Sequence, residues 1–541
     1  MSFTDYLFLP LFLLLTIVYF MVPIHKRWLV LLAASVFGLC TWGLELLPIA
    51  LLIVFITWIA AVVMDMNYKK EQNVPAAKKK NKRILTVAIV AILFFLLYTK
   101  MQKLLVGWAW GSPLVWFTSR IYQNIINGLL KLPYISMLVR DVQSGNSDIT
   151  YLFFTPLGIS YYTMSLIGYL LDVYWRKERA EKNYCKLLLF AIYFPKVFQG
   201  PIARHKDLAG QLCEGHKFDY HRYCFGWQRM LWGYFKKLVI ADRLSIFVNL
   251  VFGNYETYHG SQFLVAAVFG AFQLYCDFSG CMDIALGASQ IFGIELAENF
   301  KRPFFSRSAA EFWRRWHITL GAWFKDYVYM PLVISPRLLA VSGKLRKSVG
   351  KRTGKAFITV IPLSVVWLLT GLWHGSGWNY IIWGIYWGIL IIVSTVFEPE
   401  MKKFAGFAHI NTESKGYILF RQFRTFLLFV ISRIITIPSK LEATGDIFKK
   451  IFTDFAPWKL VDGSIYELGL DRANFSLAII VLVLLLFVSQ KQESGVVIRE
   501  RIEALPLIPR WIFWIAATFV VLIFGVYGVG YSASAFVYMN Y

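Results

Sequence analysis

The chain reads LVAAVFGAFQLYCDFSGCMDIALGASQIF from Leu264 to Phe292, an apolar stretch long enough to cross the hydrocarbon core of a bilayer as one helix. Two carboxylates, Asp277 and Asp283, interrupt it. Further apolar runs occur at residues 7–23, 47–63, 84–98, 475–488 and 511–526. Continuous apolar blocks are typical of membrane helices, because the strands of membrane barrels alternate between polar and apolar residues. We therefore predict an all-α, polytopic membrane protein with roughly 10–12 transmembrane helices.

The composition agrees with a membrane protein, since 57% of the 541 residues are hydrophobic, 18% are aromatic and only 16% are charged. The net charge of +24 does not indicate a nucleic-acid partner, because the basic residues gather in loops beside the apolar runs, as the positive-inside rule describes. The six cysteines form no CxxC pair, and the histidines lack the spacing of metal ligands. We therefore expect no nucleic acid, no metal and no bound cofactor.

Basic loops assign the two sides of the membrane. The loop of residues 69–83 is strongly basic and is predicted to be cytoplasmic, which places the N-terminus outside. The basic segment of residues 301–355 is assigned to the cytoplasm by the same rule. Two apolar runs, Phe357 to Trp373 and Tyr380 to Phe397, then meet toward the outer side.

Some apolar segments are predicted not to cross the membrane. The run of residues 187–199 is too short to span and ends in Gly200-Pro201, so we predict a re-entrant element there. Apolar side chains recur at helical spacing in residues 114–129 and again in residues 447–455. These two segments are predicted to be helices that lie in the membrane interface.

A histidine in the membrane is a functional candidate, because the fold has to offset the cost of burying it. On a helix, Trp367, Gly371, His374 and Trp378 would share a face, since they are spaced by four, three and four residues. A desolvated imidazole stays neutral and can accept a proton, so His374 is predicted to be a general base acting on a hydroxyl. The alternative is a histidine that only forms hydrogen bonds between helices.

The second candidate histidine, His317, lies in the predicted cytoplasmic segment. Arg314 and Arg315 are beside it, and Glu311 can pair with Arg315 at four residues' distance. One interpretation is an entry site whose cations attract a phosphate-bearing donor. The other is an interfacial amphipathic helix with tryptophan anchors and snorkelling arginines. The residues predicted to share its helical face are Trp313, Leu320 and Phe324.

The two carboxylates of the first apolar stretch need partners, because an unpaired charge in an apolar run is costly. Asp277 and Asp283 could orient a histidine or an arginine from behind, or they could brace neighbouring helices. We favour the bracing role.

Several sequence motifs occur in a fixed order along the chain. Upstream they are Pro156-Leu157-Gly158-Ile159-Ser160-Tyr161-Tyr162 and Phe194-Pro195-Lys196. Downstream they are Asp277-Phe278-Ser279-Gly280, Glu298-Asn299-Phe300-Lys301-Arg302-Pro303, Asp326-Tyr327-Val328-Tyr329-Met330-Pro331-Leu332 and Gly371-Leu372-Trp373-His374-Gly375. In this order the motifs resemble the membrane-bound O-acyltransferase family, and most closely its alginate O-acetyltransferase-like bacterial branch.

The resemblance implies one membrane-embedded domain over residues 1–541, with a funnelled centre and a catalytic motif region at about residues 262–397. It implies that His374 is the catalytic histidine and that His317 is the second important one. Members of the family take an acyl group from a cytoplasmic thioester, here acetyl-CoA or an acyl-carrier thioester. In this branch the group crosses the bacterial cell membrane and reaches hydroxyls of a cell-surface polysaccharide, usually through a separate extracytoplasmic partner.

The histidine motifs and the resemblance together define a candidate site. The residues assigned to substrate binding are Trp313, Arg314, Arg315, Trp373 and Asn379. The residues assigned to a supporting role are Asp277, Asp283 and Asp326. Three alternatives stay open: a D-alanyl transferase of the teichoic-acid type, a transporter or flippase that makes no bond, and a scaffold without catalysis.

Overall fold

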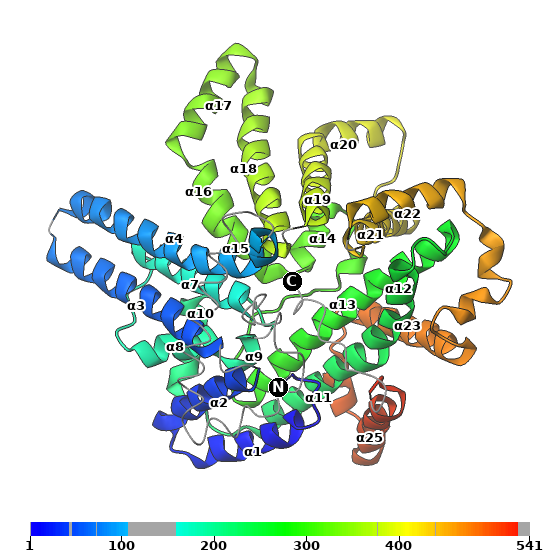
Figure 1. Ribbon diagram of the computed structural model, residues 1–541, viewed down its shortest axis with the longest axis horizontal. Coiled ribbons are helices and arrows are strands. Elements are labelled where there is room, and N and C mark those ends of the chain that lie inside the picture. The colour runs from blue at the N-terminus through cyan, green and yellow to red at the C-terminus, as the bar shows by residue number, and fades with distance from the viewer. Residues whose placement is uncertain are drawn as a thin grey trace. The chain divides into compact units, whose positions relative to one another are not determined.

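The computed structural model of the chain describes residues 2–42, 46–71, 73–106, 158–197, 199–375, 377–438 and 440–527. These residues are almost entirely helical and contain no β-strand, only an isolated bridge between Phe300 and Trp316 (Figure 1). The predicted all-α, polytopic class is confirmed. The interfacial helix predicted at residues 114–129 and the motif residues Pro156-Leu157 lie outside the described residues.

The chain packs as two compact units. One contains Met1–Asp219 with Phe292–Leu296, and the other contains Tyr220–Ile291 with Ala297–Tyr541. Apart from residues 292–296, the predicted catalytic region of residues 262–397 belongs to the second unit. The described helices of the first unit are α1 (Phe8–Met21), η1 (Ile24–Lys26), α2 (Arg27–Trp42), α3 (Leu46–Lys70), α4 (Val74–Val106), α7 (Ile159–Tyr174), α8 (Tyr184–Ile192), α9 (Phe194–Val197) and α10 (His205–Glu214).

The run predicted to be re-entrant forms the end of α8 and all of α9. Asn183 caps α8, because its side-chain oxygen accepts hydrogen bonds from the backbone N–H groups of Cys185 and Lys186. At the start of α9, the backbone N–H of Phe194 donates to Ser35 Oγ at 3.0 Å. Residues 187–197 are buried throughout, so this irregular backbone is covered by protein.

The second unit holds both candidate histidines. It begins with a bent helix made of α11 (Tyr220–Tyr234), the π-helical segment η4 (Phe235–Ala241) and α12 (Asp242–Gly253), which packs along the long helix α13 (Gly260–Ile291). The other described elements are η5 (Pro303–Phe305), α14 (Ala309–Arg315), α15 (Ile318–Phe324), η6 (Lys325–Tyr329), α16 (Met330–Val333), α17 (Pro336–Ser348), α18 (Lys351–His374), α19 (Trp378–Val396), α20 (Glu398–Phe407), α21 (Lys415–Thr436), α22 (Leu441–Thr453), η7 (Pro457–Leu460), η8 (Ser464–Glu467), α23 (Arg472–Glu493), α24 (Ile498–Glu503) and α25 (Leu507–Phe524).

Glycines allow α11 and α13 to pack backbone to backbone. A Cβ on Gly233 would lie 2.7 Å from the carbonyl oxygen of Gly280, and a Cβ on Gly287 would lie 2.5 Å from that of Gly226. No side chain fits at such distances. Gly280 is the glycine of the Asp-Phe-Ser-Gly motif, so a packing requirement accounts for it.

Eight of the described helices are long and apolar enough to cross a membrane. They include α3, α13, α18, α19, α23 and α25, and large apolar side chains such as Ile480, Phe487 and Ile515 remain exposed on them, as lipid-facing residues do. The predicted span of residues 7–23 falls short of this length, since α1 has 14 residues. Two further helices are not among the eight: α7 has 16 residues, and α21 carries several basic side chains. The predicted interfacial segment of residues 447–455 includes the end of α22, in which Ile447 is buried and Phe452 is exposed; Phe455 follows the helix.

Candidate functional site

His374 is the last residue of α18, directly before the turn into α19. The two helices cross closely at Gly371, which has no side chain. A Cβ at this position would lie 2.6 Å from the carbonyl oxygen of Tyr380. Gly371 and His374 are buried on α18, as predicted. The prediction that Trp378 shares their helical face is wrong: the helix ends at His374, and Trp378 begins α19 with 69% of its surface exposed. The helical spacing continues across the turn in sequence but not in space.

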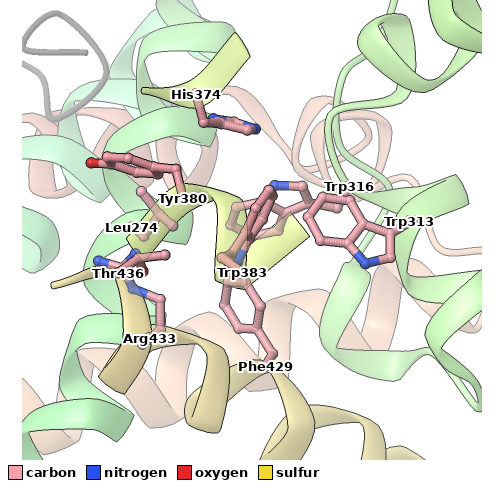
Figure 2. A pocket seen from close by; sticks show the side chains of 9 residues that line it. All are labelled: Leu274, Trp313, Trp316, His374, Tyr380, Trp383, Phe429, Arg433 and Thr436. Carbon is pink, nitrogen blue, oxygen red and sulfur yellow. The ribbon is translucent and has the colours of Figure 1, made fainter. Parts of the chain in front are cut away.

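Aromatic rings enclose the His374 imidazole. The ring centroids of Trp373 and Trp383 lie 4.8 and 4.9 Å from its own, and only 5% of the residue is exposed. One face of the imidazole borders a cavity of about 30 Å³, which has room for one or two water molecules. Figure 2 shows the side chains around this cavity. They are Leu274, Trp313, Trp316, His374, Tyr380, Trp383, Phe429, Arg433 and Thr436.

His317 lies at a break between two short helices rather than within one helix. The helix α14 ends at Arg315, α15 begins at Ile318, and His317 has a left-handed backbone with a φ of 47°. The predicted single face through Trp313, His317, Leu320 and Phe324 is therefore wrong. The break is held by a neighbouring strand-like segment, since Lys301 N–H donates to the carbonyl oxygen of Arg315 and Ile318 N–H donates to that of Asn299. This pairing stabilises a backbone conformation that non-glycine residues rarely adopt.

Asn299 organises the side chains at this break. Its Oδ1 accepts hydrogen bonds from Thr319 N–H at 3.0 Å and from Thr319 Oγ1 at 2.9 Å, and it lies 3.4 Å from His317 Nδ1. The ring of Phe278, from the Asp-Phe-Ser-Gly motif, packs edge-on against the His317 ring at 4.8 Å. Burial lowers the pKa of His317 from its ordinary value of 6.5 to about 3, so the imidazole is neutral at physiological pH.

The low pKa of His317 predicts how stability changes with pH. Between pH 6.5 and pH 3 the unfolded chain binds a proton at this residue that the folded protein does not, so stability falls as the pH falls below about 6.5. One such group changes the free energy of unfolding by at most ~1.4 kcal/mol per pH unit. Melting temperatures from pH 7 to pH 4 should therefore fall less steeply for His317→Gln than for the wild type. Parallel curves would contradict the burial of a neutral imidazole.

One indole contacts both histidines. The Trp373 ring lies 5.7 Å from the His317 ring and 4.8 Å from the His374 ring. The cavity beside His374 is not lined by His317. Among the described residues, the two imidazoles are therefore linked by ring contacts through Trp373.

Comparison with known proteins agrees with this arrangement of motifs. Residues 178–345, which include His317 and Asn299, match the sequence model of the MBOAT, membrane-bound O-acyltransferase family. This segment of the chain therefore resembles the family in sequence. A Pseudomonas syringae protein named "Probable alginate O-acetylase AlgI" is 36% identical over 306 residues, which are 56% of this chain and 53% of that protein. The protein of the same name from Azotobacter vinelandii is 29% identical over 480 residues, which are 88% of this chain and 82% of the relative.

A third relative, the peptidoglycan O-acetyltransferase of Helicobacter pylori, is 32% identical over 275 residues, covering 46% of this chain and 49% of the relative. The chain thus spans about half the length of the Pseudomonas and Helicobacter relatives in these matches. The family motifs quoted from the sequence occur in both units, while the two histidines lie in the second unit.

The residues that were assigned to substrate binding lie in different surroundings. Trp313 lines the cavity, and Trp373 contacts both imidazoles. Arg315 is paired with Glu311 at 2.7 Å, as the sequence spacing predicts, and with Glu493 at 2.8 Å, while Arg314 is exposed. The Asn379 side chain donates to the carbonyl oxygen of Pro438 at 2.7 Å, a contact that fixes the start of α19.

The carboxylates of α13 form ion pairs with the bent helix that packs beside it. Asp277 binds Lys237 at 2.8 Å, and Lys237 also binds Asp242 at 2.8 Å. Asp283 binds Lys236 at 2.6 Å and Arg229 at 3.0 Å. The two lysines are consecutive residues of the π-helical segment η4, which faces α13. Their ion pairs and that of Arg229 join α13 to η4 and α11. Asp326, the third supporting candidate, lies half-buried in the π-helical segment η6.

Two residues of the site were missed from the sequence. Asn299 was quoted within a motif without a role, and its function depends on contacts across the chain. Arg433 lies in an apolar run near the end of α21, where the rule that singled out the histidines applies equally to a basic residue. That rule would have found it.

Proposed function

We propose that this protein is an O-acyltransferase that moves an acyl group, expected to be acetyl, from a cytoplasmic thioester to hydroxyls of a cell-surface polysaccharide. The final transfer outside the bacterial cell membrane uses a separate extracytoplasmic partner. The family match and the names of the relatives support the reaction class. The observation that carries the proposal is a buried imidazole, His374, at the wall of an aromatic cavity.

His374 acts as the general base in this proposal. It accepts the proton of an acceptor hydroxyl as the hydroxyl oxygen attacks the thioester carbonyl carbon. The new C–O bond forms, the C–S bond breaks, and the leaving thiolate takes a proton from the imidazolium, so the base is regenerated. The acceptor hydroxyl belongs to the polymer itself or to the extracytoplasmic partner. An acyl-imidazole intermediate on His374 is the alternative route to the same products.

His317 is proposed as a positioning residue. It is neutral and fully enclosed, and it contacts the Trp373 indole that packs against His374. The donor's phosphate is expected near Arg314, because this guanidinium is exposed while Arg315 is already engaged by two carboxylates.

The aromatic cavity is smaller than a binding site for an acyl thioester, because ligand pockets usually measure several hundred Å³. We therefore expect the α18–α19 hairpin or α21 to shift when the substrates enter, since these helices supply most of the lining.

The test is a transfer assay with purified full-length protein in detergent or liposomes. Radiolabelled acetyl-CoA or an acetylated carrier protein is supplied on the cytoplasmic side, and covalent label is sought on an acceptor. Label on an acceptor supports the transferase. Movement of label across the membrane without bond formation would identify a carrier instead. A D-alanyl-carrier thioester in a parallel reaction separates the acetyl donor from the D-alanyl donor suggested by the teichoic acid D-alanyltransferases among the relatives.

A further inference from the structure

Arg433 is a buried cation whose described surroundings do not balance its charge. Only 6% of the residue is exposed. Its Nη1 donates to Thr436 Oγ1 at 2.7 Å, while its Nε has no hydrogen-bond partner among the described residues. No described carboxylate forms an ion pair with it, whereas the buried Lys236 and Lys237 of η4 each pair with at least one carboxylate. A guanidinium remains charged at any physiological pH, so this charge is not removed by deprotonation.

The other arginines of α21 lack this property. Arg421 and Arg424 donate to the backbone carbonyl oxygen of Arg307 at 3.1 and 3.2 Å and do not line the cavity. Arg433, two to three turns further along, lines the cavity that His374 also borders. Figure 2 shows the imidazole and the guanidinium on opposite sides of this space, with Tyr380 and Trp383 between them in the view.

The rest of the lining is poorly suited to solvating a cation. Apart from Thr436, the side chains that complete the cavity are aromatic or aliphatic. A buried charge is strongly unfavourable unless it is paired and hydrogen-bonded, and the pairing is strongest with a carboxylate or phosphate that a guanidinium can hold by two parallel bonds. Thr436 also donates to the carbonyl oxygen of Ser432, so its oxygen is fixed as an acceptor for Arg433 and orients the guanidinium.

We propose that Arg433 binds an anionic oxygen, from a carboxylate or a phosphate, on the substrate that reacts at His374. The inference rests on the proposed acyl transfer and adds a requirement on the substrate. One substrate must carry a negatively charged group that lies across the cavity from the atom reacting at His374. An acceptor with a carboxylate near its hydroxyl meets this requirement directly. An acceptor with a phosphate near its hydroxyl meets it equally.

Anion binding is tested first without any turnover. The melting temperature of the purified full-length protein is measured with sodium acetate, with inorganic phosphate and with sodium chloride at matched ionic strength. Acetate or phosphate should raise the melting temperature of the wild type above the chloride value, and Arg433→Gln should lose that increment. Arg424→Gln, on the same helix, should keep it. An increment that persists in Arg433→Gln, or no increment in the wild type, overturns the proposal. An increment with acetate alone assigns a carboxylate as the anion, and one with phosphate alone assigns a phosphate.

The second test separates substrate binding from a structural role. In the transfer assay, Arg433→Gln should raise KM for the anionic substrate by about 10- to 100-fold, the usual effect of losing a charge-assisted hydrogen bond. The change in kcat should be much smaller, and Arg433→Lys should be intermediate, because it keeps the charge without the paired bonds. A fall in kcat at unchanged KM would overturn the assignment. The two proposals can fail separately. If the wild type bound the anion but transferred no acyl group, and Arg433→Gln did not bind the anion, the proposed function would fail and the anion site would stand.

Discussion

His374→Ala is expected to lower acyl transfer by ~10²–10⁴-fold, the contribution that a positioned general base usually makes. The imidazole is buried at the end of α18, between Trp373 and Trp383, at the wall of the aromatic cavity. No other described histidine lines that cavity, so none is placed to take over the proton. The loss should appear in initial rates measured with labelled donor, at equal amounts of folded protein.

Truncation of a buried ring also removes packing contacts, so the His374→Ala result needs two control variants. His374→Gln keeps most of the volume and lacks a comparable base, and it should be about as inactive as the alanine variant. His221→Ala removes an exposed histidine that pairs with Glu503 on the surface, and it should retain the wild-type rate. Transfer at the wild-type rate by both His374 variants would reject His374 as the general base.

Lys237→Met is expected to destabilise the protein by ~3–5 kcal/mol, the usual cost of removing one partner from a buried ion pair. Lys237 is fully buried and bridges Asp277 of α13 and Asp242 of α12, each at 2.8 Å. Without the ammonium group, two carboxylates would face each other in an apolar interior. The measurement is thermal or denaturant unfolding of the detergent-solubilised protein, followed by loss of helical signal.

The matched control for this prediction is an exposed ion pair. Lys402 pairs with Glu398 four residues earlier on α20 and is 77% exposed, so Lys402→Met should change stability by less than ~1 kcal/mol. The double variant Lys237→Met with Asp277→Leu should recover part of the lost stability, because it removes one of the stranded carboxylates. Equal stability of Lys237→Met and Lys402→Met would show that the interior pair does not brace the helices.

The sequence was a good guide to the fold because length and hydropathy decide which segments can cross a bilayer. The stretch from Leu264 to Phe292 is one long helix, α13, and the runs on either side of His374 are α18 and α19. Helix ends were less predictable. The spacing that links Trp313 to Phe324 continues through His317, yet the helix breaks there because residues 299–301, which precede α14 in the chain, pair with its end.

The candidate site could be predicted in its chemistry but not in its geometry. Burial cost singled out both histidines, and Glu311 and Arg315 pair as their spacing predicts. That Trp373 contacts both rings, and that Arg433 faces the same cavity as His374, depends on how α14, α18 and α21 pack together. Spacing along one helix carries no information about such contacts.

The contact of the Trp373 indole with both imidazoles bears on the leakage of ions across the membrane. A protein that transfers a chemical group from the cell interior to the surface must not let protons and other ions cross the membrane down their gradients. Trp373 packs against both rings, and the cavity beside His374 holds little more than a water molecule or two. In the proposed transferase, aromatic packing of this kind around the two histidines would hinder ion leakage in the resting protein.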